Sequence, residues 1–261
     1  MIKLKNALSS ALSSSGGQKV GSILFLGGGG PYNAQEGSTS LLIQGKDKVL
    51  IDCGPLVYAS LQKETDISGI SIVLTSCTES SIGSLATLVS HLSQESGQPK
   101  IYCADHLVER IEMYLYNVCG LPDGTVLFCG PSGPSMDVSF YETSPETATC
   151  VLDFDKYTVV HSGQINSSVF PVIEKANPIK LKKLGDRASD VMVFHDASLT
   201  DDDYGCFYER LSDHADKFKN FFVFGHSEED GQKMMFTHRY MRSMAKKGGV
   251  QEFNIEQSFN V

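Results

Sequence analysis

The chain has 261 residues, of which 41% are hydrophobic and 20% charged, as in an ordinary globular protein. Its 22 basic and 31 acidic residues give a formal net charge of −9, which argues against a general binder of nucleic acid or of anionic membranes. Seven cysteines, with no CxxC pair, argue against a disulfide framework or a structural zinc site. No signal peptide and no apolar run of transmembrane length is recognised. We therefore expect an intracellular protein in a reducing compartment, most simply the cytoplasm.

The first 20 residues, MIKLKNALSSALSSSGGQKV, are rich in serine and contain lysines but no acidic residue. This composition is typical of a flexible leader, and a weak organellar targeting segment is the alternative. No repeat, linker or long low-complexity stretch interrupts the rest of the chain. We therefore expect a leader over 1–20 and a single domain over 21–261.

Short apolar, β-branched runs in the first half of the chain predict strands, and apolar residues at helical spacing predict helices between them. The predicted strands are 22–27, 38–45, 48–54, 71–75 and 100–104. The predicted helices run from about Ile82 to Leu92 and over 105–118. The alternation of hairpins with strand–helix units indicates mixed sheets covered by helices, an α/β (α+β) fold.

The second half of the chain begins with consecutive strands and continues with helices between buried strands. The predicted strands are 125–130, 136–143, 148–154, 157–163, 190–197, 220–226 and 250–255. The predicted helices are 168–176, 203–218 and 227–247, the last with acids at its start and lysines at its end. The large side chains along this last helix fit either core packing or an adaptable protein contact. They are Met234, Met235, Tyr240, Met241 and Met244.

The stretch IVLTSCTESSIGSL, residues 72–85, begins like a strand and ends like a helix. Strand-to-helix turns of this kind are where many α/β proteins place their chemistry. The turn between the two elements carries a row of small hydroxyls: Ser76, Thr78, Ser80 and Ser81.

Five motifs fall in one order and spacing: LFLGGGG, STSLLIQGKDKVLIDCG, ISIVLTSCTESSIGSLATL, HSGQI and VMVFHDASL. Together they resemble the metallo-β-lactamase superfamily, nearest its ribonuclease Z-like phosphodiesterase branch. The resemblance runs from about residue 22 to about residue 245. It implies a four-layer αββα sandwich, in which two mixed sheets pack face to face with helices outside.

The resemblance also implies which residues would hold metal. The family binds one or two zinc ions, which lower the pKa of a bound water, and a threonine-led His-x-His-x-Asp-His turn supplies the first ligands. Here Thr75 is kept, but the four ligand positions hold hydroxyls: Ser76, Thr78, Ser80 and Ser81. The next two ligand positions hold Ser144 and Gln164, and only the final ligand, His226, is retained.

A single retained ligand does not hold zinc, because zinc sites use three or four. We therefore expect no metal and no other cofactor, and no catalytic residue. The chain is interpreted as a degenerate member of the family: a pseudoenzyme that acts as a structural or protein-interaction subunit of a larger assembly. The sequence does not name the protein partner or the oligomeric state.

Two alternatives stay open. The emptied pocket is a candidate site for a nucleotide or another phosphorylated ligand, which hydroxyls and Gly-rich backbone amides would hold. The residues of that pocket would be Gly28, Gly29, His161, His195 and His226. Alternatively, a serine of the turn is the nucleophile of a metal-free hydrolase, with His161 or His226 as its base. A purely structural role for these serines is the simplest interpretation.

Overall fold

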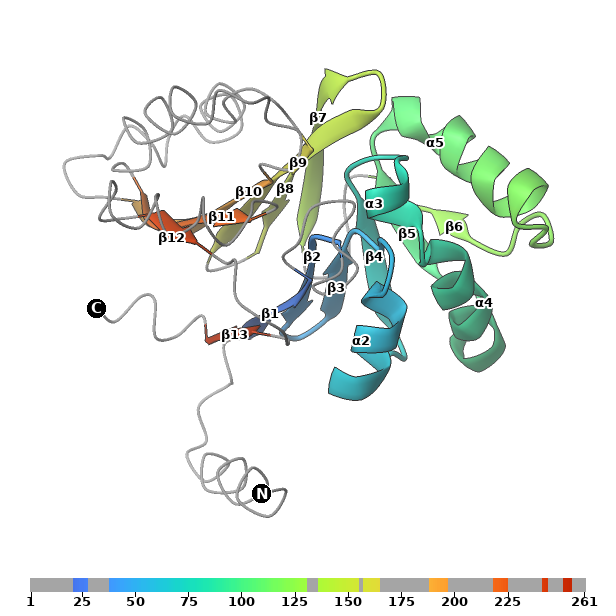
Figure 1. The fold of residues 1–261 in the computed structure, drawn as a ribbon, viewed down its shortest axis with the longest axis horizontal. Coiled ribbons are helices and arrows are strands. Elements are labelled where there is room, and N and C mark those ends of the chain that lie inside the picture. The colour runs from blue at the N-terminus through green and yellow to red at the C-terminus, as the bar shows by residue number, and fades with distance from the viewer. Residues whose placement is uncertain are drawn as a thin grey trace, which may run out of the picture.

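A computed structural model of the chain describes residues 21–27, 38–130, 136–154, 157–164, 188–196, 218–224, 241–243 and 251–254. Over these residues, two mixed β-sheets pack against each other, and helices cover the outer face of the first sheet (Figure 1). This arrangement confirms the predicted α/β class, with two mixed sheets and flanking helices.

The first sheet has seven strands in the order β13-β1-β2-β3-β4-β5-β6. Their bounds are β1 Ser22–Gly27, β2 Ser40–Gln44, β3 Lys48–Ile51, β4 Ile70–Leu74, β5 Lys100–Cys103, β6 Leu127–Phe128 and β13 Gln251–Asn254. Strands β13, β1, β2 and β3 pair antiparallel, whereas β3, β4, β5 and β6 pair parallel. Parallel neighbours need long connections, and the helices of the first half lie in them.

The second sheet has six strands in the order β12-β11-β10-β9-β8-β7. Their bounds are β7 Asp137–Ser144, β8 Thr147–Asp153, β9 Thr158–Gln164, β10 Ala188–Asp196, β11 Phe218–Phe224 and β12 Met241–Ser243. Strands β7, β8 and β9 form an antiparallel meander, and β9 to β12 pair parallel.

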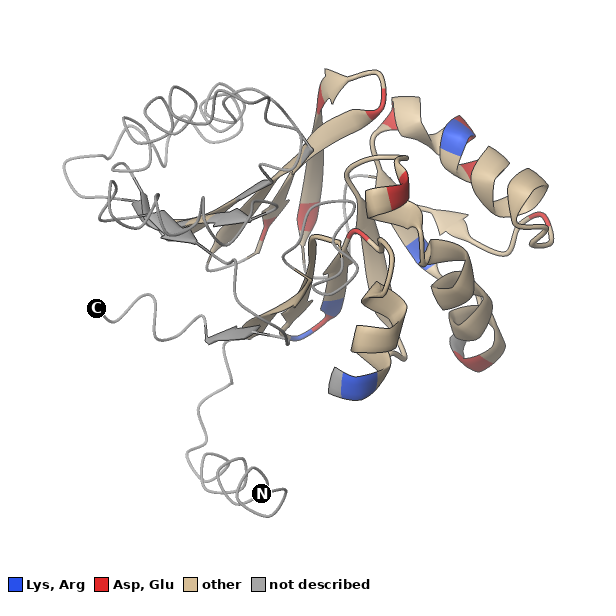
Figure 2. Ribbon diagram, in the orientation of Figure 1, with Lys and Arg blue, Asp and Glu red and all other residues tan. Residues whose placement is uncertain are grey.

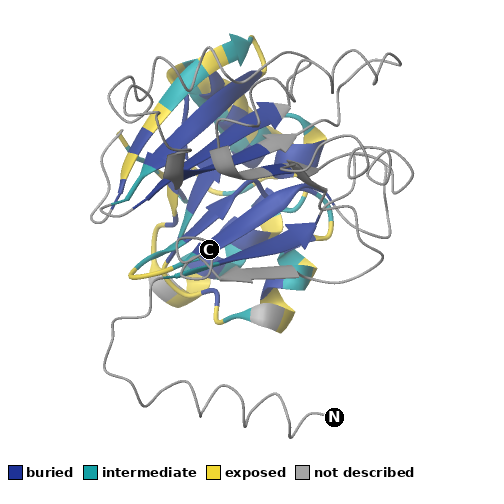
Figure 3. Cartoon of the chain, turned by 90° about the vertical axis from the view of Figure 1, so that its left-hand side faces the viewer, coloured by how far each residue is buried: buried dark blue, intermediate teal, exposed yellow. Residues whose placement is uncertain are grey.

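Both faces of the first sheet are buried, which explains why its strands appear as continuous apolar runs in the sequence. On β1, Phe25 packs between the sheets, with ring centroids 5.6 Å from Phe194 and 5.9 Å from Phe222. Its neighbour Leu24 belongs instead to the cluster under the helices. Figure 3 shows the described strands of both sheets as largely buried.

Four α-helices and a π-helix are described, and they lie on the side of the first sheet away from the second (Figure 1). Their bounds are α2 Val57–Glu64, α3 Glu79–Ile82, α4 Leu85–Ser96, α5 Asp105–Glu112 and η2 Met113–Val118. Helix α4 buries its apolar face completely at helical spacing, which anchors it to the sheet. The buried residues of that face are Leu85, Leu88, Val89 and Leu92.

Most predicted elements within the described ranges are confirmed to within a few residues. The predicted helix at 82–92 is two helices, α3 and α4, and the predicted strand at 125–130 shrinks to β6. Helix α2 was not predicted, because its eight residues, VYASLQKE, are too few to show a clear helical period, although several of them are strong helix formers. It forms because Val57 and Leu61, one turn apart, are both fully buried in the core.

The predicted helix at 227–247 is wrong at its C-terminal part. Residues Met241–Ser243 form strand β12, which pairs parallel with Phe221–Val223 of β11. Pairing with a sheet edge satisfies the backbone groups of this segment and overrides its helical composition. Met241 therefore does not lie on a helix face with the other methionines, as the sequence predicted, but in a strand.

Other predictions lie outside the described residues. These are the leader over 1–20, the helix at 168–176, most of the helix at 203–218, and residues 227–240. The division into a leader and one domain stays a prediction. Among the described residues, no helix is long and apolar enough to cross a membrane.

Candidate functional site

Residues 75–81, called the hydroxyl turn below, follow β4 and include the first three residues of α3. At its start, the buried carboxylate of Asp52 accepts the Thr75 amide at 2.8 Å and the Thr75 hydroxyl at 2.6 Å. Asp52 has a φ of 59°, a left-handed conformation that Asp tolerates better than most residues. At the other end of the turn, the Cys53 amide donates to the Ser81 carbonyl at 2.7 Å. The segment after β3 therefore holds both ends of the turn.

The four hydroxyls of the turn bond to one another. The Ser76 hydroxyl lies 2.7 Å from that of Thr78 and donates to that of Ser81 at 2.9 Å. The Thr78 hydroxyl lies 2.9 Å from that of Ser80, and the Thr78 amide donates to the Ser76 hydroxyl at 3.1 Å. Ser76, Ser80 and Ser81 are no more than 5% exposed. The turn is thus a network of mutually bonded hydroxyls, three of them buried and that of Thr78 half-buried, rather than a row of outward-facing groups.

The hydroxyl turn also joins the two sheets, because its first residues run antiparallel to the start of β8. The Thr75 carbonyl accepts the Ala148 amide at 2.7 Å. The Cys77 amide donates to the Glu146 carbonyl at 3.3 Å. The residues between these two bonds form an isolated antiparallel bridge. The backbone of the turn is therefore fixed from both sheets.

Ser144 lies beside this junction. It is the last residue of β7, and its hydroxyl is 2.8 Å from that of Thr147. The Thr147 hydroxyl also lies 2.8 Å from that of Thr143, and Thr147 is the bridge partner of Ser76. A second cluster of hydroxyls thus adjoins the first.

Two glycines let backbone segments approach the turn. A Cβ atom on Gly54 would lie 1.9 Å from the Ser80 carbonyl oxygen. Gly163 has a φ of +66°, and a Cβ atom there would lie 2.5 Å from the Ala148 carbonyl oxygen. Gln164 directly follows Gly163 at the end of β9, so its backbone also reaches this junction.

The remaining predicted site residues are distributed as follows. His161 lies within β9 and is fully buried, and its Nδ1 accepts the Gly163 amide at 3.1 Å. His195 lies in β10, opposite Val223 in the parallel register with β11. Three predicted site residues fall outside the described ranges: Gly28, Gly29 and His226.

Burial also determines the acid–base behaviour of the thiols near the turn. Burial raises the pKa of the Cys53 thiol well above its usual value of 9.0, and the neighbouring Asp52 carboxylate raises it further. The same two causes raise the pKa of Cys150. Both thiols are therefore uncharged and unreactive in the folded protein.

An exposed ion pair lies over the outer edge of the turn. The Arg110 guanidinium of α5 donates to the Glu146 carboxylate at 3.1 Å and lies 3.9 Å from the Cys77 sulfur. The pKa of Arg110 is raised, chiefly by the hydrogen bond to Cys77 and then by that to Glu146. This pair links the helical layer to the β7–β8 hairpin.

The described residues do not fit the zinc ion that the family resemblance implies. Zinc is held by thiolates, imidazoles and carboxylates. Nowhere in the described part of the chain do three such side chains come together as a possible metal site. The positions in the turn offer hydroxyls that are already bonded to one another.

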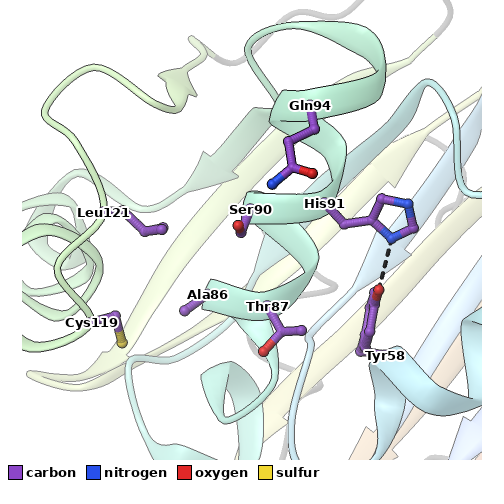
Figure 4. Close-up of a pocket in the computed structure, with 8 residues that line it drawn as sticks. All are labelled: Tyr58, Ala86, Thr87, Ser90, His91, Gln94, Cys119 and Leu121. Carbon is purple, nitrogen blue, oxygen red and sulfur yellow. Dashed lines mark hydrogen bonds between the residues drawn. The ribbon is translucent and has the colours of Figure 1, made fainter.

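The described residues also form a groove that the sequence did not predict. It crosses the outward face of α4 and is bounded by Tyr58 and His91 on one side and by Cys119 and Leu121 on the other (Figure 4). Sequence reasoning missed it because Tyr58 belongs to the unpredicted helix α2. The spacing of Thr87 and His91 on the predicted helix, with Gln94 just beyond its predicted end, was the only available signal.

The chain matches no protein-family model and no curated protein. It does match solved structures over nearly its whole length. The metallo-β-lactamase fold protein YhfI from Bacillus subtilis covers 89% of this chain and 99% of its own, with 14% identity and a TM-score of 0.66. The short form of human tRNase Z covers 88% and 98%, with 15% identity and a TM-score of 0.53. A diphosphatase of the PhnP family covers 90% and 98%, with 14% identity and a TM-score of 0.56.

These similarities show that the chain has the metallo-β-lactamase fold, as its motifs predicted. At identities of 14 to 15%, they establish the architecture alone. Function must therefore be argued from the residues of this chain.

Proposed function

We propose that the protein is a pseudoenzyme with the metallo-β-lactamase fold, which binds no zinc at the hydroxyl turn and serves as a structural or protein-interaction subunit. The observation that carries this proposal is the mutual pairing of Ser76, Thr78, Ser80 and Ser81. Hydroxyls that satisfy one another need no cation, and the four former ligand positions carry no charge for a cation to balance.

The interaction role is supported by a scaffold that is intact and a former metal site that lacks its ligands. The chain maintains two sheets and a helical layer, while nowhere among its described residues do three potential metal ligands come together. Its net charge of −9 argues against nucleic acid as a general partner. Without a metal site, the function would depend on the surface of the fold. We propose that other proteins bind that surface.

A rewired hydrolase is the first alternative, because the similar structures include a tRNase Z and a diphosphatase. It would require a serine with a neighbouring base. The hydroxyl of Ser76 already bonds within the turn, and the Nδ1 atom of His161 already accepts an amide. These engagements favour the pseudoenzyme.

A site for a nucleotide in the emptied pocket is the second alternative. Hydroxyls that recognise phosphate must face the ligand, whereas Ser76, Ser80 and Ser81 are buried. Opening the turn would break its internal hydrogen bonds before any new ones form. Burial therefore weighs against this alternative as well.

The proposal is tested by metal content and turnover together. The full chain is purified without added metal, dialysed against zinc and then freed of excess metal, and its zinc is measured by elemental analysis. We expect well below one ion per chain, and no hydrolysis of bis(p-nitrophenyl) phosphate above the buffer rate. Zinc at one or two ions per chain would overturn the proposal.

Metal-free turnover would also overturn it, in favour of the hydrolase. Ser80→Ala and His226→Ala identify that case, since both would abolish a rate that depends on the turn and leave a contaminating activity unchanged. The subunit role has its own readout. The chain isolated under native conditions from its source cells should elute well above its own 28.4 kDa, and recovery of the monomer alone contradicts that role.

A further inference from the structure

The groove on α4 has the size of a ligand site. Its volume is about 560 Å³, within the range of a few hundred to a thousand cubic ångströms that is usual for small-molecule sites. We call it the α4 groove. It is lined by Tyr58, Ala86, Thr87, Ser90, His91, Gln94, Cys119 and Leu121 (Figure 4).

A chain of hydrogen bonds fixes one wall of the α4 groove. The Gln62 amide donates to the Tyr58 hydroxyl oxygen at 2.8 Å, and that hydroxyl lies 2.7 Å from Nδ1 of His91. The Nε2 atom of His91 lies 2.9 Å from the Glu95 carboxylate. Which of Tyr58 and His91 donates depends on the protonation of the imidazole, and in either case the two side chains are joined. Both rings are therefore held in place before any ligand arrives.

The rest of the lining offers hydrogen-bonding groups that are not yet used. Thr87, Ser90 and Gln94 lie on the open face of α4, and the structure gives their side chains no hydrogen bond to any described residue. Ala86 and Leu121 add apolar surface beside them. A held aromatic wall, apolar patches and convergent polar groups are the usual parts of a small-molecule site.

The charge of the lining limits the ligand. None of the eight lining residues is Lys, Arg, Asp or Glu. Figure 2 shows no Lys or Arg anywhere on α4. The nearby Glu95 is already engaged by His91. Phosphate or carboxylate would find no cation here, and a ligand amine would find no free acid.

We propose that the α4 groove binds an uncharged small molecule rich in hydroxyl or amide groups, of the size of a nucleoside or a disaccharide. Thr87, Ser90 and Gln94 supply the hydrogen bonds, and Tyr58 supplies the rigid wall. The site is independent of the proposed function, because no residue of the hydroxyl turn lines it. A pseudoenzyme and an active hydrolase would both carry it.

The test uses the purified full chain and three probes: adenosine, maltose and AMP. Binding is measured by saturation-transfer NMR and by amide shifts of uniformly labelled protein. At least one of the two neutral probes should bind, with shifts centred on Thr87, Ser90 and Gln94. AMP should bind no more tightly than adenosine, because the groove holds no cation for its phosphate.

Two variants locate the binding in the groove. Ser90→Trp fills it and should weaken the neutral probe by at least about tenfold, whereas Glu109→Trp, on the exposed face of α5 outside the groove, should not. Thr87→Val keeps the shape but removes a hydroxyl, and should weaken binding by about fivefold.

Three results would overturn the inference. They are the failure of both neutral probes to bind, binding that survives Ser90→Trp, and AMP binding more than tenfold tighter than adenosine. Tighter binding of AMP would mean that the probes bind at a phosphate-binding region outside the α4 groove. None of these results depends on zinc content or hydrolysis. This inference can therefore be wrong while the proposed function stands, and the reverse.

Discussion

The hydroxyl turn and the α4 groove contain the same kinds of side chain in opposite states. In the turn, Ser76, Ser80 and Ser81 are buried, and their hydroxyls belong to one hydrogen-bonded network. In the groove, Thr87 and Ser90 face outward without such bonds. Serine and threonine hydroxyls are thus used up by internal hydrogen bonds in the turn and left for a ligand in the groove. Burial and pairing, rather than residue type, distinguish the two sites. The predictions below test that difference.

The largest expected effect is a difference in the labelling rates of two thiols. Cys53 lies buried behind the turn, whereas Cys119 is exposed in the groove. At pH 8, iodoacetamide should label Cys119 within minutes, while Cys53 reacts only through unfolding. With about 5 kcal/mol of stability, that protection slows labelling of Cys53 by at least roughly a thousandfold. Peptide mass spectrometry over a time course measures both rates.

The pH dependence of this protection follows from the raised pKa of Cys53. Because the folded-state pKa lies above the usual 9.0, the buried thiol contributes its full stability below pH 9. That contribution is lost as pH rises above 9, since the unfolded chain ionises first. Equal labelling of the two thiols at pH 8 would show that the turn is open in solution.

A smaller effect is expected from Gly54→Ala. Its new methyl group would collide with the Ser80 carbonyl, which is backbone and cannot rotate away. We expect a loss of about 3 kcal/mol in the free energy of unfolding, measured by urea denaturation. Gly130→Ala is the matched control, because nothing lies within 4 Å of its added carbon. Similar losses for both variants would mean that the turn is not tightly packed.

The smallest effect compares one serine from each region. Ser76→Ala removes the hydroxyl at the centre of the network and leaves the Thr78 amide without its acceptor. This should cost about 2 kcal/mol in thermal or urea unfolding. Ser90→Ala removes a hydroxyl from the groove and should change stability by less than about 0.5 kcal/mol. A neutral Ser76→Ala would argue against a structural network in the turn.

The sequence predicted most strands because both faces of the first sheet are buried, which leaves short apolar runs such as VLI in β3 and IVL in β4. It failed where tertiary contacts decide. Helix α2 depends on Val57 and Leu61 reaching the core, and β12 depends on pairing with β11. Neither contact has a local signature.

The candidate sites were also predicted only in part, because their tertiary contacts leave no signal in the sequence. The sequence placed the turn correctly after β4, but Ser80 and Ser81 belong to α3 rather than to a loop before the helices. It did not show that the hydroxyls bond to one another, because that depends on side-chain rotamers and on the bridge to Thr147. The groove wall joins Tyr58 to His91 across 33 positions, a contact that exists only once α2 and α4 have packed.

The pairing of β1 with β13 has a consequence for synthesis. Ser22 pairs with Asn254, so one side of β1 waits for 232 further residues before its hydrogen-bonding partner exists. At a translation rate of about 5 to 20 residues per second, that delay is roughly 10 to 50 s. During this time the nascent chain exposes an apolar strand edge, which is a natural place for a chaperone to act.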